Sequence, residues 1–159
     1  MRILIVSDTH RRDDIFFRVM EKEQPVNMLI HAGDVEGSED FYEAMGECEF
    51  HCVAGNNDFF SMLPMEEEFY IGTNKVFLTH GHQYRISVNE DLILDEAKAR
   101  GANILIYGHT HRPVADWRDG ILVMNPGSLT YPRQEGRRPS YIILEVAKSG
   151  NMRPFIKYL

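Results

Sequence analysis

Short aliphatic runs and amphipathic segments alternate along the first sixty residues of the chain. Arg2–Ser7 is rich in β-branched residues and ends in polar ones, which is typical of a strand buried on both faces. In Asp13–Lys22 the apolar residues recur at helical spacing, which predicts a helix. The other elements expected in this half are strands at Met28–Ala32 and Glu49–Ala54, and a helix at Ser38–Met45 with Ser38 as its N-cap.

The second half of the chain has a different pattern, with pairs of strands joined by tight turns. A helix is expected at Asn89–Arg100, with Leu92, Ile93 and Ala97 on its apolar face, and a strand at Asn103–Tyr107. Three hairpins are expected: Glu67–Ile71 with Lys75–Thr79, Val114–Arg118 with Ile121–Asn125, and Ser140–Ala147 with Asn151–Tyr158. The stretch Gln134–Pro139 is expected to be a mobile surface loop. Since a domain has roughly 150 residues, the 159 residues predict one α/β domain over 1–159.

The amino-acid composition limits the kinds of partner expected for this protein. The 17 Lys and Arg residues against 24 Asp and Glu residues give a net charge of −7, which argues against a stable nucleic-acid partner. No apolar run approaches the roughly 20 residues of a spanning helix, so no membrane partner is expected. Cys48 and Cys52 are too few for a disulfide framework. We expect both on one side of a single strand, as core residues of a cytoplasmic protein.

Polar clusters follow five of the expected strands. They are Ser7-Asp8-Thr9-His10, Gly33-Asp34, Gly55-Asn56-Asn57-Asp58, His80-Gly81-His82 and Gly108-His109-Thr110-His111. Ligands of α/β sheets bind at the carboxyl ends of the strands, so these clusters are expected to converge. The glycines that precede Asp34, Asn56 and His109 are expected to permit sharp turns there.

The donor atoms of these clusters indicate a metal centre. Oxygen and nitrogen donors without thiolate suit Mn²⁺, Fe or Zn²⁺ and do not suit a structural cysteine zinc site. A single Asp-x-His motif is usually a solvated loop, and a single His-Gly-His is equally unspecific. Five clusters in series are not explained in that way. They predict a centre for two divalent ions.

The ordered set of motifs resembles the calcineurin-like metallophosphoesterases. With Asn125-Pro126-Gly127-Ser128 added, it is similar to the small YfcE-type phosphodiesterase branch, and the resemblance runs from Met1 to about Arg133. It implies a four-layer α/β/β/α sandwich of two mixed sheets, with the metal site at the carboxyl ends of the strands.

The resemblance also assigns roles to residues. One ion is expected on Asp8, His10 and His111, and the other on Asn56, His80 and His109, with Asp34 bridging both. Asp58 is expected to orient the backbone or a ligand, and Asn125 and Ser128 to shape the wall. His82 is either a ligand or a residue that faces the substrate. Mn²⁺ is the expected metal, with Fe, Ni²⁺ and Zn²⁺ as alternatives.

The implied reaction is hydrolysis of a small phosphodiester by a metal-bridging hydroxide, with Asp34, Asn57, Asp58 and His82 as the catalytic set. Many family members carry a histidine directly after the asparagine ligand, whereas this chain carries Asn57. An amide donates hydrogen bonds but supplies no proton at neutral pH, so esters with good leaving groups are expected to be favoured. Four arginines flank the motifs and are candidates to bind further phosphate oxygens. The alternative is that they are solvated surface residues. They are Arg11, Arg12, Arg112 and Arg133.

Three other functions stay open at this point. The chain also resembles the retromer scaffold subunit, which has the same fold and binds proteins. The metal motifs in the N-terminal part of that subunit are degraded, whereas the corresponding motifs of this chain are intact. A phosphomonoesterase or a nuclease would use the same site.

The apolar cluster Phe59–Leu63 is expected to form either a contact of a homo-oligomer or a lid on the core.

Overall fold

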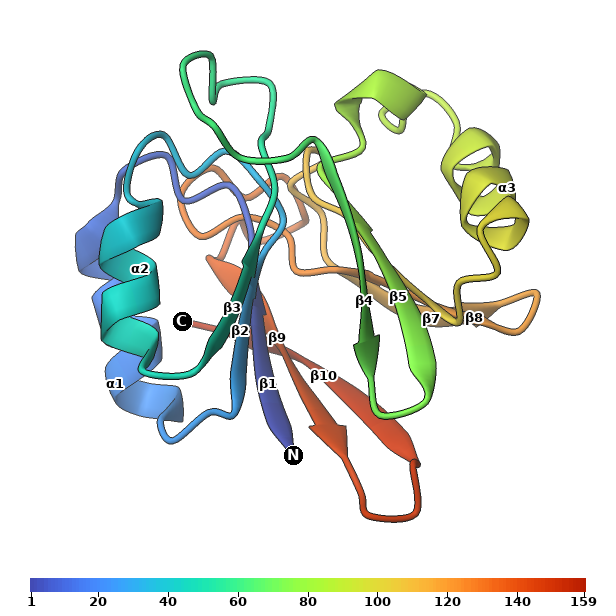
Figure 1. Ribbon diagram of the computed structural model, residues 1–159. Helices are drawn as coiled ribbons and strands as arrows, with labels where there is room; N and C mark the ends of the chain where they lie inside the picture. The colour runs from blue at the N-terminus through green and yellow to red at the C-terminus, as the bar shows by residue number, and fades with distance from the viewer.

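Two five-stranded sheets pack face to face in the computed structural model, which describes residues 1–159 (Figure 1). The first sheet contains β1 (Arg2–Val6), β2 (Met28–His31), β3 (Glu49–Cys52), β9 (Ser140–Val146) and β10 (Met152–Tyr158). Its order is β10-β9-β1-β2-β3. β1, β2 and β3 run parallel, whereas β9 lies antiparallel to both β1 and β10.

The second sheet is mixed in the same way. It contains β4 (Glu66–Ile71), β5 (Asn74–Thr79), β6 (Ile104–Ile106), β7 (Val114–Arg118) and β8 (Ile121–Asn125), in the order β4-β5-β6-β8-β7. The three central strands are parallel, and the two edge strands are antiparallel to their neighbours. The parallel strands of both sheets end at the upper edge of the molecule in Figure 1.

Helices cover the outer face of each sheet. α1 (Asp13–Glu23) and α2 (Glu39–Gly46) lie on the first sheet, and α3 (Asp91–Ala99) lies on the second, with a 3₁₀ turn at His82–Tyr84 before it (Figure 1). The predicted four-layer α/β/β/α arrangement of two mixed sheets is therefore confirmed.

The alternation of side chains along β1 shows why the layers form. Ile3 and Ile5 belong to the apolar cluster between the two sheets, together with Val76 and Ile106 of the second sheet. The intervening residues of β1, Leu4 among them, pack against the helical layer. A third cluster seals α3 onto the second sheet. Because both faces of β1 are covered, the strand is aliphatic throughout rather than alternating.

Most predicted elements lie within two residues of their observed bounds, and three local details differ from what the sequence led us to expect. Leu92 is 55% exposed, because Ile93 and Ala97 form the buried face of α3 and the adjacent position Leu92 is turned away from it. Ser38 occupies the N-cap position of α2, but its side chain makes no capping hydrogen bond. Cys48 lies one residue before β3, although it packs against the same apolar cluster as Cys52.

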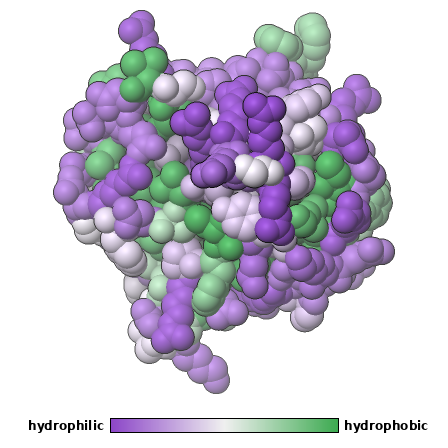
Figure 2. Space-filling model, turned by 180° about the vertical axis from the view of Figure 1, so that it is seen from behind, coloured by the Kyte–Doolittle hydropathy of each residue, from purple (hydrophilic) through white to green (hydrophobic).

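The surface carries mainly hydrophilic residues. Figure 2 shows the face opposite to that of Figure 1, where hydrophobic residues occupy small patches between larger hydrophilic areas. None of the helices has both the length and the apolar character needed to cross a membrane.

Candidate metal centre

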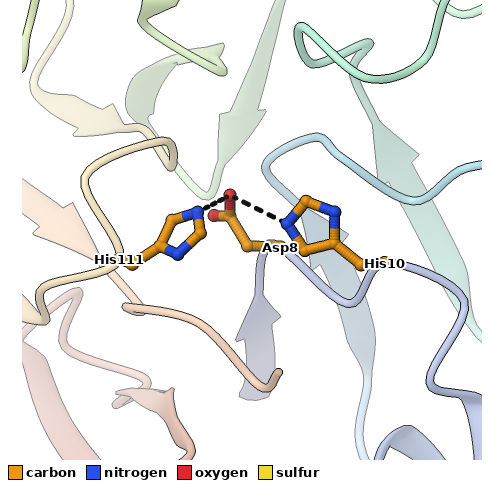
Figure 3. A group of neighbouring side chains, drawn as sticks. All are labelled: Asp8, His10 and His111. Atoms are coloured by element: carbon orange, nitrogen blue, oxygen red, sulfur yellow. Dashed lines mark ion pairs between the residues drawn. The ribbon is translucent and has the colours of Figure 1, made fainter. Parts of the chain in front are cut away.

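The connections that leave β1, β2, β3, β5 and β6 come together at the carboxyl edge of the two sheets. Potential ligand atoms of Asp8, His10 and His111 lie within 4.8 Å of one another, and so do those of Asp8, Asp34 and His80. Figure 3 shows the first group, in which the Asp8 carboxylate lies between the two imidazole rings. Asp8 and His80 are fully buried, so these groups have little access to bulk water.

Three of the histidines are held through Nδ1, which leaves Nε2 facing the centre. In each case Nδ1 donates a 2.7 Å hydrogen bond to an oxygen that only accepts. The pairs are His10 with the Glu36 carboxylate, His80 with the Ala32 carbonyl, and His111 with the Tyr131 carbonyl. A neutral imidazole that donates through Nδ1 has its lone pair on Nε2. Tethering of this kind is the usual arrangement of metal-ligating histidines.

The lone pairs of the first group face one another without a hydrogen between them. His111 Nε2 lies 2.8 Å from Asp8 Oδ1, and His10 Nε2 lies 3.9 Å from the same oxygen. Neither Asp8 Oδ1 nor His10 Nε2 has a hydrogen-bond partner, although both are buried. Facing lone pairs repel unless a proton or a metal cation lies between them. The residues present therefore fit a divalent ion.

The pKa values reflect the same crowding. Burial raises the pKa of Asp8, but the short contact with His111 and the electrostatic interaction with His80 outweigh it and bring the value to about 2. For His111, burial lowers the pKa, but the Asp8 carboxylate more than compensates and raises it overall. Asp8 is thus ionised at neutral pH and attracts a cation.

A second group of donors lies on the other side of Asp34. Asn56 Oδ1 is 2.9 Å from His109 Nδ1 and 3.2 Å from His80 Nε2. His80 Nε2 also lies 3.6 Å from Asp34 Oδ2. A carboxylate, an amide oxygen and two imidazoles are thus gathered around one position, a donor set that suits Mn²⁺, Fe or Zn²⁺. Asp34 adjoins both groups, since its Oδ2 also lies 3.8 Å from His10 Nε2.

Asn57 and Asp58 hold Asp34 from two directions. The Asn57 backbone N–H and Nδ2 donate to the two oxygens of the Asp34 carboxylate, at 2.8 and 2.7 Å. The Asp58 carboxylate accepts from the backbone N–H groups of Asp34, Glu36 and Gly55, at 2.6 to 2.8 Å. The side chain of Asp58 thus ties the connection after β2 to the connection after β3.

His82 lies beside the centre but in neither ligand group. Its ring centroid is 5.5 Å from that of His80 and 6.2 Å from that of His109. Its Nδ1 is buried without a partner. Burial and the charge of His80 lower the pKa of His82 below its ordinary value. The ring is therefore neutral at neutral pH and has a free nitrogen near the second group.

The backbone at the candidate ligands adopts an uncommon conformation. Five of them have φ between 45° and 65°, in the left-handed region: Asp8, His10, Asp34, His109 and His111. Outside glycine this conformation costs free energy, and it persists where the surrounding structure enforces it, often at functional sites.

The glycines before Asn56 and His109 are explained by space. Gly55 and Gly108 do not have positive φ. A Cβ on Gly55 would lie 2.2 Å from Asp34 Oδ1, and a Cβ on Gly108 would lie 2.1 Å from Ser7 Oγ. The expected turns are present, since the Asp58 N–H donates to the Gly55 carbonyl and the Thr110 N–H donates to the Gly108 carbonyl. Only Gly33, with φ 95°, needs the conformational freedom of glycine, whereas Gly55 and Gly108 are needed for close packing.

Residues of the wall support the site without reaching the ligand groups. Ser128 Oγ donates to the Asp8 carbonyl, and Asn125 Nδ2 donates to the Gly108 carbonyl. Two further supporting roles were not predicted from the sequence. Ser7 Oγ donates to Asp8 Oδ2 at 2.6 Å, and Glu36 accepts from His10. The acidic side chain two residues after Asp34 was an available signal for Glu36.

The other supporting groups have no signature in the sequence. The carbonyls of Ala32 and Tyr131 fix two histidines, and any residue type supplies a carbonyl. His51 lies in β3 and stacks on Phe69 with ring centroids 3.6 Å apart, and Glu67 accepts a hydrogen bond from it. His51 therefore belongs to the sheet rather than to the centre.

Fold and candidate site together are those of the metallophosphoesterase class of proteins. The family model of the calcineurin-like phosphoesterase superfamily domain matches residues 1–149, and the chain belongs to this superfamily. A probable metallophosphoesterase of Mycoplasma pneumoniae is 33% identical over 153 residues, which cover 92% of this chain and 91% of that protein. The phosphodiesterase YfcE of Escherichia coli K12 is 35% identical over 80 residues, which cover 50% of this chain and 39% of YfcE.

Solved structures resemble the whole chain. A predicted phosphoesterase of Streptococcus pneumoniae TIGR4 has a TM-score of 0.81 and 28% identity, over 98% of this chain and 97% of that one. Wild-type Vps29 of Entamoeba histolytica, complexed with zinc, has a TM-score of 0.78 and 23% identity, over 99% of each chain. The latter likeness shows the fold alone, which a phosphoesterase and Vps29 share.

Proposed function

We propose that the protein is a phosphodiesterase that works with two divalent metal ions, most favourably Mn²⁺. The observation that carries the proposal is the convergence of buried, unpartnered lone pairs at the carboxyl edge of the two sheets, which is otherwise electrostatically unfavourable. The names of the relatives support phosphoester hydrolysis.

The two groups of donors divide the ions between them. Asp8, His10 and His111 would hold one ion, and Asn56, His80 and His109 the other, with Asp34 shared. When bound, such ions supply positive charge beside the phosphoryl oxygens and lower the pKa of water, the source of the nucleophile.

The protein's own side chains orient and restrict the reaction. Asn57 keeps the Asp34 carboxylate in one orientation through two donated hydrogen bonds, and Asp58 fixes the loop that carries Asp34. Nδ2 of Asn57 has a second hydrogen for a phosphoryl oxygen, but the amide supplies no proton to a leaving group. His82 offers a neutral ring on the same side.

Two uncharged side chains beside the ligands support a diester rather than a monoester as the substrate. Asn57 and His82, which flank the two groups, are uncharged at neutral pH, so they add no cation to the site. A diester carries one negative charge, whereas a monoester dianion requires more positive charge for the same neutralisation. The small substrate expected from the sequence is thus a phosphodiester.

Hydrolysis of two aryl esters tests the function. Chelated protein is assayed on bis(p-nitrophenyl) phosphate and p-nitrophenyl phosphate, with and without added Mn²⁺. We expect metal-dependent turnover that favours the diester. Asp34→Asn is expected to lower kcat/KM at least roughly a hundredfold, because it removes the shared carboxylate.

The matched control is Asp95→Asn, which makes the same charge change on the exposed face of α3 and is expected to retain activity. Faster turnover of the monoester would overturn the diester assignment. Two bound metals without turnover of either ester would instead indicate a binding protein with this fold. The cytoplasmic location and the identity of the metal stay predictions, and elemental analysis of the purified protein tests the latter.

A further inference from the structure

Three arginines beside the candidate metal centre have no carboxylate partner. They are Arg112, Arg133 and Arg137. The ion pairs that involve arginine in this structure use Arg2, Arg12, Arg100 and Arg118. In a chain with 24 acidic and 17 basic residues, three neighbouring arginines without a partner are an unusual local excess of positive charge.

The same three arginines line one open cavity of about 680 Å³. The rest of its lining is Thr130, Tyr131 and Pro132, and no carboxylate contributes to it. Guanidinium groups present forked donors that match phosphate and carboxylate oxygens, and bringing three of them together costs free energy unless an anion compensates. The cavity is therefore complementary to an anion with several oxygen atoms.

This cavity, the arginine cavity below, is joined directly to the ligands of the first group. The His111 carbonyl accepts from the Arg133 backbone N–H at 2.9 Å, and His111 Nδ1 donates to the Tyr131 carbonyl at 2.7 Å. The Tyr131 ring lies 5.0 Å from the His10 ring, measured between centroids. Tyr131 is 60% exposed, so its ring forms part of the surface between the centre and the cavity.

We propose that the arginine cavity binds a second phosphate group of the substrate, while the phosphodiester of the same molecule lies at the metal centre. The inference rests on the proposed function and narrows its substrate class to phosphodiesters that carry a further phosphate. The arrangement supports the division: the arginine cavity adjoins the first group of ligands through His111, and its three arginines form no ion pair with a carboxylate.

Two esters that differ by one phosphate test the proposal. They are thymidine 5′-(p-nitrophenyl phosphate) and the same compound with a 3′-phosphate. With Mn²⁺ present, we expect the 3′-phosphate to lower KM about tenfold, which corresponds to about 1.4 kcal/mol. Arg133→Ala and Arg137→Ala are each expected to reduce this preference several-fold. The matched control is Arg153→Ala. Arg153 is exposed and lies level with the start of β1, at the end of the first sheet opposite to the metal centre, so this variant should preserve the preference.

A binding measurement without metal separates this proposal from the proposed function. Calorimetry in chelator compares thymidine 3′,5′-bisphosphate, thymidine 5′-phosphate and inorganic phosphate. We expect the bisphosphate to bind about tenfold more tightly than the monophosphate, and Arg137→Ala to abolish the difference. If neither ester is hydrolysed, the proposed function fails, and the calorimetry still decides whether the arginines recognise a second phosphate.

Two results would overturn the proposal. The first is equal KM values for the two esters in an active enzyme, which would leave the phosphodiesterase assignment intact. The second is tight binding of inorganic phosphate that depends on Arg137 but brings no preference for the bisphosphate, which would make the cavity a site for a free ion.

Discussion

The buried imidazole of His31 is held in one tautomer by its two neighbours. The Gly33 backbone N–H donates to Nδ1 at 3.2 Å, so Nε2 carries the hydrogen and donates to Thr9 Oγ1 at 3.0 Å. Burial lowers the pKa of His31 to about 4. The ring therefore stays neutral in the folded protein at pH values where it is protonated in the unfolded chain.

This difference predicts a pH dependence of stability. Between pH 6.5 and about 4 the unfolded chain binds more protons at this position, so the free energy of unfolding falls as the pH falls. The full shift corresponds to about 3 kcal/mol. Urea unfolding of the chelated protein at several pH values measures the slope, and His31→Asn, which keeps an acceptor for the Gly33 N–H, should remove this part of it. An unchanged slope in the variant would refute the assignment.

Asn57 predicts how the enzyme treats leaving groups. Asn57→His would introduce a proton donor beside Asp34, and general acid catalysis contributes roughly 10²–10⁴-fold where the leaving group needs a proton. We expect the ratio of alkyl-ester to aryl-ester hydrolysis to rise at least tenfold. Asn57→Ala, which removes the hydrogen bond to Asp34 without adding an acid, serves as the control. The same ratio in all three proteins would contradict the prediction.

The kinds of residue in the centre could be predicted from the sequence, but their orientation could not. Asp8, Asp34 and His111 lie in clusters that follow strands. Because parallel strands run in one direction, such clusters meet at one edge of the sheet. Which ring nitrogen faces inward depends on partners such as Glu36 and the Tyr131 carbonyl, which only the folded chain brings near. The left-handed backbone at the candidate ligands was not predicted either, although Asp and His are among the residues other than glycine that adopt it most often.

At the level of elements, the strands were predictable and one of their pairings was not. Hydrophobic periodicity located every strand, because aliphatic runs between turn residues specify strands locally. The insertion of β9 beside β1 joins Ile3 to Leu144, residues that are far apart in the chain. Such a pairing depends on tertiary packing. Similarly, the short 3₁₀ turn at His82–Tyr84 was not predicted, because three residues have no periodicity.

The loop after β3 carries an exposed apolar surface. Phe59 is 78% exposed, Phe60 101% and Met62 98%. Side chains of this kind rarely stay in water together unless they contact a partner, so we expect the protein to self-associate through this loop. Light scattering at several concentrations should show a dimer that Phe60→Ser shifts toward monomer, whereas Phe155→Ser, an exposed position on β10, should not shift it. A monomeric wild-type protein would exclude this contact.

At the scale of the molecule, the centre joins the two sheets. Asp8, Asp34 and Asn56 follow strands of the first sheet, whereas His80 and His109 follow strands of the second. Metal bound here would therefore link the two halves of the sandwich, and the folded state would gain its binding free energy.

Removal of metal is accordingly expected to lower stability. At a free Mn²⁺ concentration of about one hundred times Kd, one site adds about 2.7 kcal/mol to the free energy of unfolding. For a chain of this length that corresponds to a fall in Tm of roughly 5–10 °C on chelation. Scanning calorimetry with and without chelator measures it. Asp34→Asn should show a smaller difference, and an equal shift in both proteins would place the stabilising ion elsewhere.

The position of β9 has a consequence for the growing chain. β1 leaves the ribosome well before its neighbour β9, which begins at Ser140, so one edge of this aliphatic strand stays unpaired while the residues between the two strands are made. At roughly 5–20 residues per second this interval lasts about 7–30 s. During this interval β1 presents an unpaired sheet edge, so we expect the nascent chain to be prone to pairing with other strands until β9 and β10 are made.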